Sequence, residues 1–482
     1  MAGTGNQLHQ FQPINVSSTA KREQNCFEEI VLTPATCQLE ASEQMDGTLP
    51  ARIDCVVLGA GHAGLATSYE LTQRGVPHVI LDRGRIAETW RSKRWDAFTM
   101  IMPNWGLDLP GFPFVGDRDA FSTRDESIAH FEAYAASFGA PVRSGITVLA
   151  IAEHTDDAWP LRVETDRRTI QTRAVVVATG IYQVPRRPWF SELVAPEIVQ
   201  LDPDHYRTPA TVPAGATLVV GSGASGTQIA EDLLLAGRDV WLAVGRAGRQ
   251  PRRYRGIDSS RWNRYPGISA GSGEQAGDSG GGAARSGRRG GDRDTNLHRF
   301  AHDGMRLVGH ITGASTRDSA VLTIASDLHR TLAWIDAFDH AWRKRVDAYV
   351  ATHRDEIERE TGKTVTPGHG RPDDALRDGF DQTERTELDL QAEGITSIVW
   401  ATGYDTDYSV VHFPVIGHDG HPVHEGGVTA VPGLYFVGMT FRGDGPKSSF
   451  IGIVGPEAAA IAEQVATTVE RHDLAPCRLG HN

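Results

Sequence analysis

Two segments of the chain share one pattern of hydrophobic and polar positions. The first begins with a short apolar run at Ile53–Leu58, passes through a glycine-rich turn, and continues as a helical stretch over Leu65–Arg74. Gly75 supplies the helix stop, and a second apolar run follows at Val76–Leu81. Short runs that are apolar at every position are typical of parallel strands buried on both faces. The pattern therefore predicts a strand–helix–strand unit.

The same unit returns in the middle of the chain. An apolar run at Ala216–Val220 leads into another glycine-rich turn, and a helical segment then extends to Ala236. Gly237 follows, and the next apolar run is Val240–Val244. Two units of the same layout form an internal duplication. We therefore expect an α/β fold with two Rossmann-like dinucleotide-binding domains.

Both glycine-rich turns fit the pattern G-x-G-x-x-G and lie between a strand and a helix, which is the context that the motif requires. The first glycine makes a tight turn, the second lets the backbone approach a pyrophosphate, and the third lets helix and strand pack closely. The start of the helix then offers its N–H groups to the phosphates. The predicted binding residues are Gly59, Gly61 and Gly64 in the first turn, and Gly221, Gly223, Ser225 and Gly226 in the second.

The two units differ in the residue that closes their second strand. Asp82, followed by Arg83, closes the first. A carboxylate there accepts hydrogen bonds from ribose hydroxyls and repels a 2′-phosphate, which favours FAD or NAD. The second unit ends at Arg246, and guanidinium groups suit the 2′-phosphate of NADP. We therefore favour NADPH over NADH at the second site. More arginines follow at Arg249, Arg252, Arg253 and Arg255, and their guanidinium groups also suit this phosphate. The alternative is a solvated basic loop that leads into the insertion.

Three other stretches have their own character. Residues 1–50 are polar without periodicity, so we expect a flexible extension. Residues 257–294 are crowded with Gly, Ser and Arg, which predicts a mobile insertion, either a disordered surface loop or a lid that orders over bound ligand. Residues 330–360 carry apolar side chains at helical spacing and are expected to pack in the core.

Composition and charge narrow the function. A chain of 482 residues suits two or three domains, and a net charge of −13 argues against nucleic acid as the main partner. No apolar run is long enough to cross a bilayer and no secretory signal is evident, so we expect a cytoplasmic protein. Neither zinc spacing nor a C-x-x-C pair occurs among Cys26, Cys37, Cys55 and Cys477. We therefore expect no metal, and no redox dithiol of the kind that a disulphide reductase needs.

Further motifs complete a family resemblance. The chain resembles the two-dinucleotide flavoproteins, and more narrowly the flavin-containing monooxygenase and YUCCA-like group of class B flavoprotein monooxygenases, from about Ile53 to Val465. The second loop ends in Ser225-Gly226, as in that group. The other motifs that carry the resemblance are Thr89-Trp90-Arg91, Trp95–Phe98, Met102–Trp105, Leu109–Pro113, the two A-T-G turns at Ala178–Gly180 and Ala401–Gly403, and Pro432–Gly438.

The resemblance implies a fold and a reaction. An FAD-binding domain would be built from residues 51–205 and 386–482, with an NADPH-binding domain inserted at 206–385. NADPH would reduce FAD, reduced flavin would react with O₂, and a C4a-(hydro)peroxyflavin would transfer one oxygen atom to a small organic substrate. A homodimer is left open as the assembly. The resemblance implies further cofactor contacts at Thr89, Trp90, Thr179, Gly180, Thr402, Gly403, Gly438 and Lys447, while Arg253 is assigned to NADPH with Arg246.

Departures from the family pattern concern the oxygen step. The monooxygenase signature F-x-G-x-x-x-H-x-x-x-[YF] has its candidate at Pro196–Tyr206, where only Tyr206 fits and Asp202 replaces the histidine. For catalysis we name Asn104 as a polar contact to the flavin, or else a turn residue, and Arg91, or else a member of a surface ion pair. Two alternatives stay open, namely an FAD-dependent NAD(P)H oxidase or dehydrogenase of the same fold and a non-catalytic flavoprotein redox sensor.

Overall fold

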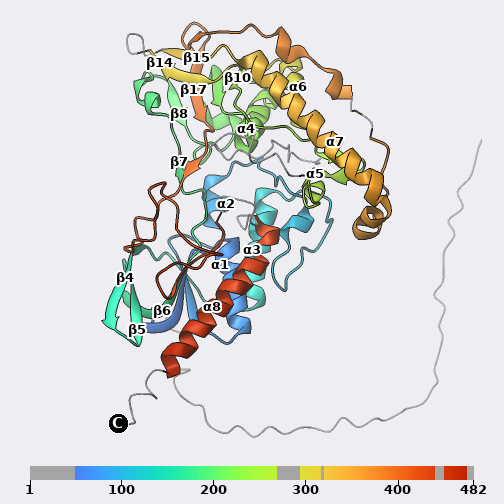
Figure 1. Ribbon diagram of the computed structural model, residues 1–482. Coiled ribbons are helices and arrows are strands. Elements are labelled where there is room, and N and C mark those ends of the chain that lie inside the picture. Colours follow the sequence, from blue (N-terminus) through green and yellow to red (C-terminus); the bar gives the residue numbers. More distant parts are fainter. Residues whose placement is uncertain are drawn as a thin grey trace, which may run out of the picture. The chain divides into compact units, whose positions relative to one another are not determined.

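Parallel pairing of short apolar strands builds the first of two large sheets (Figure 1). The computed structural model describes residues 49–268, 294–315, 320–368, 370, 372–439 and 450–474. The strand order is β3-β2-β1-β6-β5-β4, and β19 also pairs with β6. The pairs formed by β1, β2, β3, β6 and β19 with one another are parallel, whereas β4 and β5 add an antiparallel hairpin. The strands are β1 (Arg52–Leu58), β2 (His78–Asp82), β3 (Val142–Ser144), β4 (Val148–Asp156), β5 (Trp159–Thr165), β6 (Thr169–Val177) and β19 (Leu434–Phe436).

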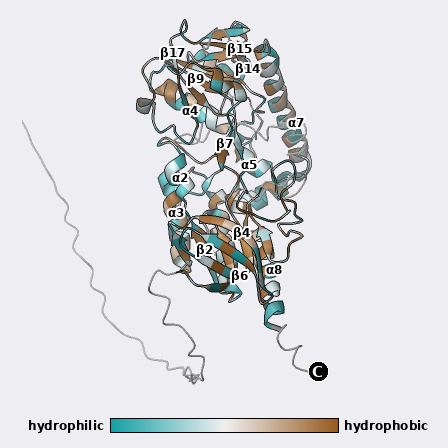
Figure 2. Cartoon of the chain, turned by 90° about the vertical axis from the view of Figure 1, so that its left-hand side faces the viewer, coloured by the Kyte–Doolittle hydropathy of each residue, from teal (hydrophilic) through white to brown (hydrophobic). Residues whose placement is uncertain are grey.

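The second sheet is parallel throughout and has the order β13-β10-β9-β17-β8. Its strands are β8 (Val199–Leu201), β9 (Ala216–Val220), β10 (Val240–Ala243), β13 (Arg306–Val308) and β17 (Ile395–Trp400). All positions of β9 and β10 are buried, as expected for strands covered on both faces. Figure 2 shows the same apolar character on the strands of both sheets.

This topology corrects the expected domain boundaries. Residues 386–482 were assigned to the FAD-binding domain, yet β17 pairs with β9 in the second sheet, and β8 likewise lies outside the expected 206–385. The chain crosses between the sheets where β7 (Val184–Pro185) pairs antiparallel with β18 (Tyr404–Asp405). The inserted domain therefore lies between β7 and β18. An apolar run predicts a buried strand, but it does not say which sheet will bury it.

Helices cover the sheets. In the first domain, α1 (His62–Gln73) packs beside α8 (Gly455–Leu474), with α2 (Glu88–Lys93) and α3 (Arg124–Ser137) close by. Their apolar residues join those of β1 and β6 in one core cluster. In the second domain, α4 (Ala224–Leu235), α6 (Leu297–His302) and the start of α7 (Leu328–Thr361) contribute to another cluster. The expected core helix over 330–360 is α7, which has a kink with non-helical backbone at His353.

Smaller elements complete the described part. The short sheets contain β11 (Arg253–Tyr254) with β12 (Ile257–Asp258), and β14 (Ile311–Ala314) with β15 (Val321–Ile324) and β16 (Glu387–Asp389). The short helices are α5 (Ser259–Trp262), η1 (Asn104–Leu107), η2 (Trp189–Leu193), η3 (Pro209–Thr211), η4 (Pro372–Ala375), η5 (Asp378–Asp381) and η6 (Ile451–Ile453). No helix among the described residues is both long and apolar enough to span a membrane.

The expected mobile insertion at 257–294 is wrong for its first part. Residues 257–268 form β12, α5 and a turn, and the side chains of Ile257, Trp262 and Ile268 are at most 1% exposed. These three residues pack with α7 in a separate cluster. Residues 269–293, and the extension expected at 1–50 apart from its last two residues, lie outside the described residues.

Candidate functional site

The first glycine of each fingerprint packs against a crossover turn of its own sheet. Gly59 and Gly221 have φ of +106° and +107°, which favour glycine. A Cβ at Gly59 would lie 2.6 Å from the carbonyl oxygen of Ala178, and one at Gly221 would lie 2.5 Å from that of Ala401. Both contacted residues begin an A-T-G turn, so each A-T-G turn closes tightly over one fingerprint. The requirement for glycine at these two positions is steric.

The third glycine of each motif has the packing role predicted for it. A Cβ at Gly64 would lie 1.9 Å from the carbonyl oxygen of Gly59, and one at Gly226 would lie 1.9 Å from that of Gly221. Real Cβ atoms do not approach an oxygen so closely. Each helix packs against its loop only because the third glycine has no side chain. The two units have the same distance at this contact.

The second glycine differs from the other two. A Cβ at Gly61 or at Gly223 would meet no atom of the described residues within 4 Å. These glycines are the N-caps of α1 and α4, and neither helix start has a side-chain cap. Uncapped amides beside open space at a helix N-terminus fit the pyrophosphate of a dinucleotide. Both loops therefore have the shape that FAD and NADPH require, and Ser225 lies in the first turn of α4.

Asp82 holds the first loop and its own strand end together. Its Oδ2 accepts the amide of Ala60 at 2.7 Å, and its Oδ1 accepts the amide of Gly84 at 2.7 Å. The free lone pairs of the carboxylate still allow a ribose contact. A cavity of about 560 Å³ opens beside it, lined by Arg83, Gly84, Arg85, Glu88, Ser144 and Gly145. This is the edge of the sheet where the adenosine of a dinucleotide is expected.

The late strand β19 brings Gly438 to the first fingerprint. Gly438 has φ of +75°, and a Cβ on it would lie 2.5 Å from the Cβ of Ala63 in α1. Its amide donates to the carboxylate of Glu457 at 3.0 Å. The contact agrees with the implied place of this strand end beside the flavin-binding loop. Lys447 falls outside the described residues.

At the second site the end of β10 is tied to the glycine loop. The hydroxyl of Ser222 is 3.0 Å from both the amide and the carbonyl oxygen of Gly245. Arg246 comes next, is exposed, and has no hydrogen-bond or ion-pair partner within the described part of the chain. An unpaired guanidinium at the end of the second strand suits an anionic group on the coenzyme ribose.

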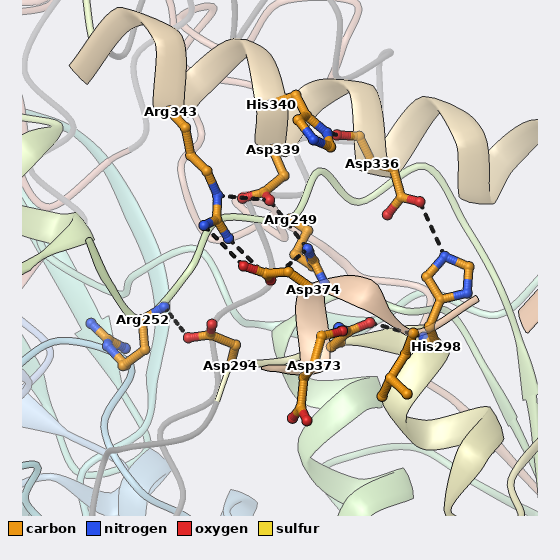
Figure 3. A network of polar contacts seen from close by, with 12 residues as sticks. Arg249, Arg252, Asp294, His298, Asp336, Asp339, His340, Arg343, Asp373 and Asp374 are labelled. Carbon is orange, nitrogen blue, oxygen red and sulfur yellow. Dashed lines mark hydrogen bonds and ion pairs between the residues drawn. The ribbon is translucent and has the colours of Figure 1, made fainter. Parts of the chain in front are cut away.

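The later arginines have structural partners instead. Arg249 is 3.1 Å from Asp339, which also pairs with Arg343 on the same helix at 2.9 Å, and Figure 3 shows this buried network along α7. The side chain of Arg252 is 0% exposed and lies 2.7 Å from Asp258. Arg255 pairs with Asp347 at 2.7 Å. Arg253, expected at the coenzyme, donates to the carbonyl oxygen of Asp119 at 3.1 Å.

The T-W-R segment lies in α2 and at the surface. Trp90 packs edge-on to Phe98, with ring centroids 5.6 Å apart, and Thr89 is exposed. Arg91 forms an ion pair with Glu132 of α3 and donates to the carbonyl oxygen of Ile86. The structure therefore favours the surface ion pair as the role of Arg91.

Asn104 is buried and its side chain holds a neighbouring loop. Its Nδ2 donates to the carbonyl oxygen of Asp117 at 2.8 Å, and its Oδ1 accepts the amide and the hydroxyl of Ser122 at 2.8 and 2.6 Å. The amide oxygen already receives two donors. The geometry favours the turn interpretation of Asn104 over direct contact with the flavin.

The A-T-G turns lie at the ends of β6 and β17, as the resemblance implied. Gly180 and Gly403 follow with φ of +75° and +98°. Thr402 donates to the carbonyl oxygen of Arg186, and Thr179 accepts a hydrogen bond from Gln183 at 3.1 Å. These contacts fix the two crossings between the sheets.

The degenerate monooxygenase signature is built into the same junction. Asp202, which replaces the family histidine, binds both guanidinium arms of Arg187 at 2.7 and 2.8 Å. The hydroxyl of Tyr206 donates to Asp232 at 2.6 Å, and burial raises the pKa of this phenol. Asp202 thus has a structural partner in Arg187, and the imidazole of His205 lies 3.5 Å from the same carboxylate.

One group of residues was missed by the sequence reasoning. Asp204 is only 5% exposed, receives a hydrogen bond from Tyr404 at 2.6 Å, and pairs with Lys93 at 2.8 Å. It therefore connects α2 of the first domain to the second crossing. In the sequence, the one indication of a role for Asp204 is that it lies within the candidate monooxygenase signature at residues 196–206.

Cys55 is the one cysteine that falls within the described residues. It lies in β1, is fully buried, and burial raises the pKa of its thiol. A thiol of this kind is inert.

Comparison with known proteins found similar sequences among oxidoreductases. Residues 56–261 match the family model described as pyridine nucleotide-disulphide oxidoreductase. An uncharacterized CzcO-like oxidoreductase of Geobacillus kaustophilus is 27% identical over 86% of this chain and 98% of that protein. The indole-3-pyruvate monooxygenase YUCCA1 of Oryza sativa subsp. japonica is 32% identical over 42% of this chain and 50% of its own length. Apart from the CzcO-like protein, the matches thus span about half of the relative.

Solved structures share the fold. A flavin-containing monooxygenase from Stenotrophomonas maltophilia has a TM-score of 0.57 with 20% identity, over 87% of this chain and 99% of that one. The bacillithiol disulfide reductase of Staphylococcus aureus has a TM-score of 0.55 with 13% identity, over 87% and 99%. The expected class, an α/β fold with two Rossmann-like domains of which the second is inserted in the first, is confirmed. In sequence and in fold the chain is similar to the two-dinucleotide flavoprotein oxidoreductases, among which are flavin-containing and YUCCA monooxygenases.

Proposed function

We propose that the chain is an FAD-dependent, NADPH-using monooxygenase that inserts one oxygen atom of O₂ into a small organic substrate. The observation that carries the proposal is the pair of matching loops. Each has a glycine, Gly61 or Gly223, whose missing Cβ leaves open space at an uncapped helix start. Two such loops in one chain suit one flavin dinucleotide and one nicotinamide dinucleotide.

The residues of the chain have separable tasks in this reaction. The amides at the starts of α1 and α4 bind the two pyrophosphates. Asp82 would accept hydrogen bonds from the ribose of FAD, and Arg246 would bind the 2′-phosphate of NADPH. Bound FAD would supply hydride acceptance from the coenzyme and reaction with O₂. Gly438 allows β19 to approach the flavin loop closely, and Asp204 with Lys93 holds the two domains at their crossing.

The proposal also names partners and a location. The substrate is a small organic molecule and the co-substrate is O₂, in a cytoplasmic enzyme that assembles as a homodimer. Light scattering on the purified holoenzyme tests the dimer, and cell fractionation tests the location.

A second candidate is an NADPH oxidase of the same fold. It is favoured by the junction, because Asp202 is engaged with Arg187 where the family has histidine, and Asn104 is engaged with Ser122. Without a group that protects the oxygenating species, reduced flavin would return H₂O₂. A non-catalytic redox sensor would show no turnover at all.

The deciding experiment follows the oxygen atom. The purified flavoprotein is supplied with NADPH, ¹⁸O₂ and one probe substrate from each class: a thioether, a tertiary amine, an aryl ketone and indole-3-pyruvate. A product that carries one ¹⁸O, formed with matching NADPH consumption, supports the monooxygenase. Stoichiometric H₂O₂ with every probe would favour the oxidase, and absence of flavin from the purified protein would overturn both.

A further inference from the structure

The carboxyl ends of three parallel strands meet at one edge of the second sheet. β9 leads into the glycine loop, β10 into Gly245 and Arg246, and β13 into Gly309 and His310. Coenzymes bind at this edge in doubly wound sheets. Under the proposed function the first two strand ends bind NADPH, whereas no sequence motif gives a role to the third. His310 is the first side chain beyond β13.

Asp327 holds His310 in one orientation. The carboxylate Oδ1 accepts the amide of His310 at 3.1 Å, and Oδ2 lies 2.7 Å from Nδ1 of its ring. Gly309 makes this approach possible, since a Cβ there would lie 2.2 Å from the carbonyl oxygen of Ala325 and 2.6 Å from Oδ1 of Asp327. The ring is fixed at its backbone and at one nitrogen, so Nε2 is the nitrogen left for another contact.

Asp327 occupies the N-cap position of α7, yet its side chain makes no cap hydrogen bond there. An N-cap aspartate normally accepts amides of its own helix, at about 1 kcal/mol. Here Glu384 accepts the amide of His329 at 3.0 Å and the hydroxyl of Ser326 at 2.8 Å. Glu384 thus binds the helix start, and both oxygens of Asp327 contact His310.

The ring of His310 lies over the end of β10. Its Nε2 is 4.0 Å from the position that a Cβ would take on Gly245. The neighbouring Arg246 is exposed and has no partner among the described residues. Asp327 at the start of α7 contacts this imidazole, Arg330 lies 3.9 Å from Asp327, and Arg246 follows Gly245 in the chain at the end of β10. A guanidinium after β10 and an imidazole after the neighbouring β13 are residue types that suit a phosphate.

We propose that His310, oriented by Asp327, is a second ligand for the 2′-phosphate of NADPH and makes the choice between NADPH and NADH depend on pH. The inference rests on the proposed use of a nicotinamide coenzyme. Only the protonated imidazole donates a charged hydrogen bond from Nε2 when Nδ1 is directed at a carboxylate. The preference for NADPH is therefore larger at acid than at alkaline pH.

The test measures coenzyme binding to the oxidised holoenzyme without oxygen, so that it does not depend on oxygen transfer. Dissociation constants for NADPH and NADH are compared at pH 6.0 and 8.5 in the native enzyme, His310→Gln, Asp327→Asn and the control His329→Gln. The control lies on the same helix start, where its Nε2 contacts the carbonyl oxygen of Gln382 at 2.9 Å.

We expect His310→Gln and Asp327→Asn to weaken NADPH binding about 10- to 100-fold at pH 6.0 relative to native enzyme, the effect of one charged hydrogen bond, and hardly at all at pH 8.5. NADH binding and His329→Gln should stay within twofold of native. The comparison at each pH cancels the ionisation of the phosphate itself, and NADH reports any misfolding. Equal losses for both coenzymes, or a loss independent of pH, would overturn the phosphate contact. If neither coenzyme binds native enzyme, the proposed function fails instead.

Discussion

At the residue scale, the three glycines of one loop have different physical reasons to be glycine. Gly64→Ala would place a Cβ 1.9 Å from a backbone oxygen, whereas a Cβ at Gly61 would meet no atom of the described residues within 4 Å. We expect Gly61→Ala to fold with near-native thermal stability and to lose bound flavin, because the methyl group enters the space needed for the pyrophosphate. Flavin absorbance after purification and the melting temperature of the apoprotein check the two parts.

The matched control for this change is Gly223→Ala. It repeats the substitution at the second loop, so the variant should stay yellow and bind NADPH at least tenfold more weakly. A Gly61→Ala protein with stoichiometric flavin would contradict the assignment of the first site.

Arg246 is the single arginine of its stretch with an exposed and unpaired head group in the described structure. We expect Arg246→Ala to raise the KM for NADPH about 10- to 100-fold, since a charge-assisted contact of 1.5–3 kcal/mol is lost. The KM for NADH should change less than threefold. Steady-state kinetics with both coenzymes measure the ratio, and Arg359→Ala, at an exposed position of α7, serves as the control. A similar increase for both coenzymes would remove Arg246 from the 2′-phosphate.

At the element scale, side chains of the segment that follows β10 contact a loop of the first domain, residues 101–122. The buried side chain of Arg252 binds Asp258, donates to the carbonyl oxygen of Ile101 at 2.6 Å, and lies over the ring of Phe121 with its Cζ 4.4 Å from the centroid. Arg261 and Arg264 lie over Trp105 in the same way. The coenzyme loop and the loop at 101–122 are therefore joined through one short stretch of chain.

Breaking these contacts should lower the free energy of unfolding. Arg252→Met would leave the carboxylate of Asp258 buried without its cation, and loss of one member of a buried pair typically costs about 3–5 kcal/mol. Arg186→Met removes a pair with Asp405 in which both side chains are half exposed, so we expect a cost below about 1 kcal/mol. Chemical unfolding of both FAD-loaded variants gives the two free energies. Equal costs would show that Arg252 does not stabilise the junction.

The same elements show what sequence patterns can and cannot predict. β9 has the predicted bounds because an unbroken apolar run is specific for a strand buried on both faces. The assignment of Arg249, Arg252 and Arg255 to the coenzyme was less successful, because their aspartate partners are brought to them by the fold. The packing of Trp262 between polar neighbours was equally invisible, since a single apolar residue carries no period.

At the scale of the whole molecule, three histidines should set the response to acid. Burial lowers the pKa of His78, His130 and His424, and all three make hydrogen bonds within the fold. His78 contacts Ser68 and the carbonyl oxygen of Val76. A histidine with a lowered folded pKa takes up protons more readily in the unfolded chain. Stability from these groups is therefore complete above about pH 6.5 and falls as the pH drops from there toward the folded pKa values.

We accordingly expect the free energy of unfolding to decline between pH 7 and pH 5. Carboxylates such as Asp108 and Asp336 have lowered pKa values, so they remain ionised in this range and contribute little to the slope. His78→Gln keeps a polar side chain but cannot titrate, so its slope against pH should be smaller than that of the native protein whatever constant cost the substitution adds. Urea unfolding at half-unit intervals measures both slopes. Parallel curves for the two proteins would contradict a role for His78, and a native curve flat from pH 7 to 5 would exclude all three histidines. The same measurement on FAD-saturated enzyme separates protonation of the fold from loss of the flavin. A decline that persists there comes from the buried imidazoles, because FAD binding adds stability by mass action without altering them.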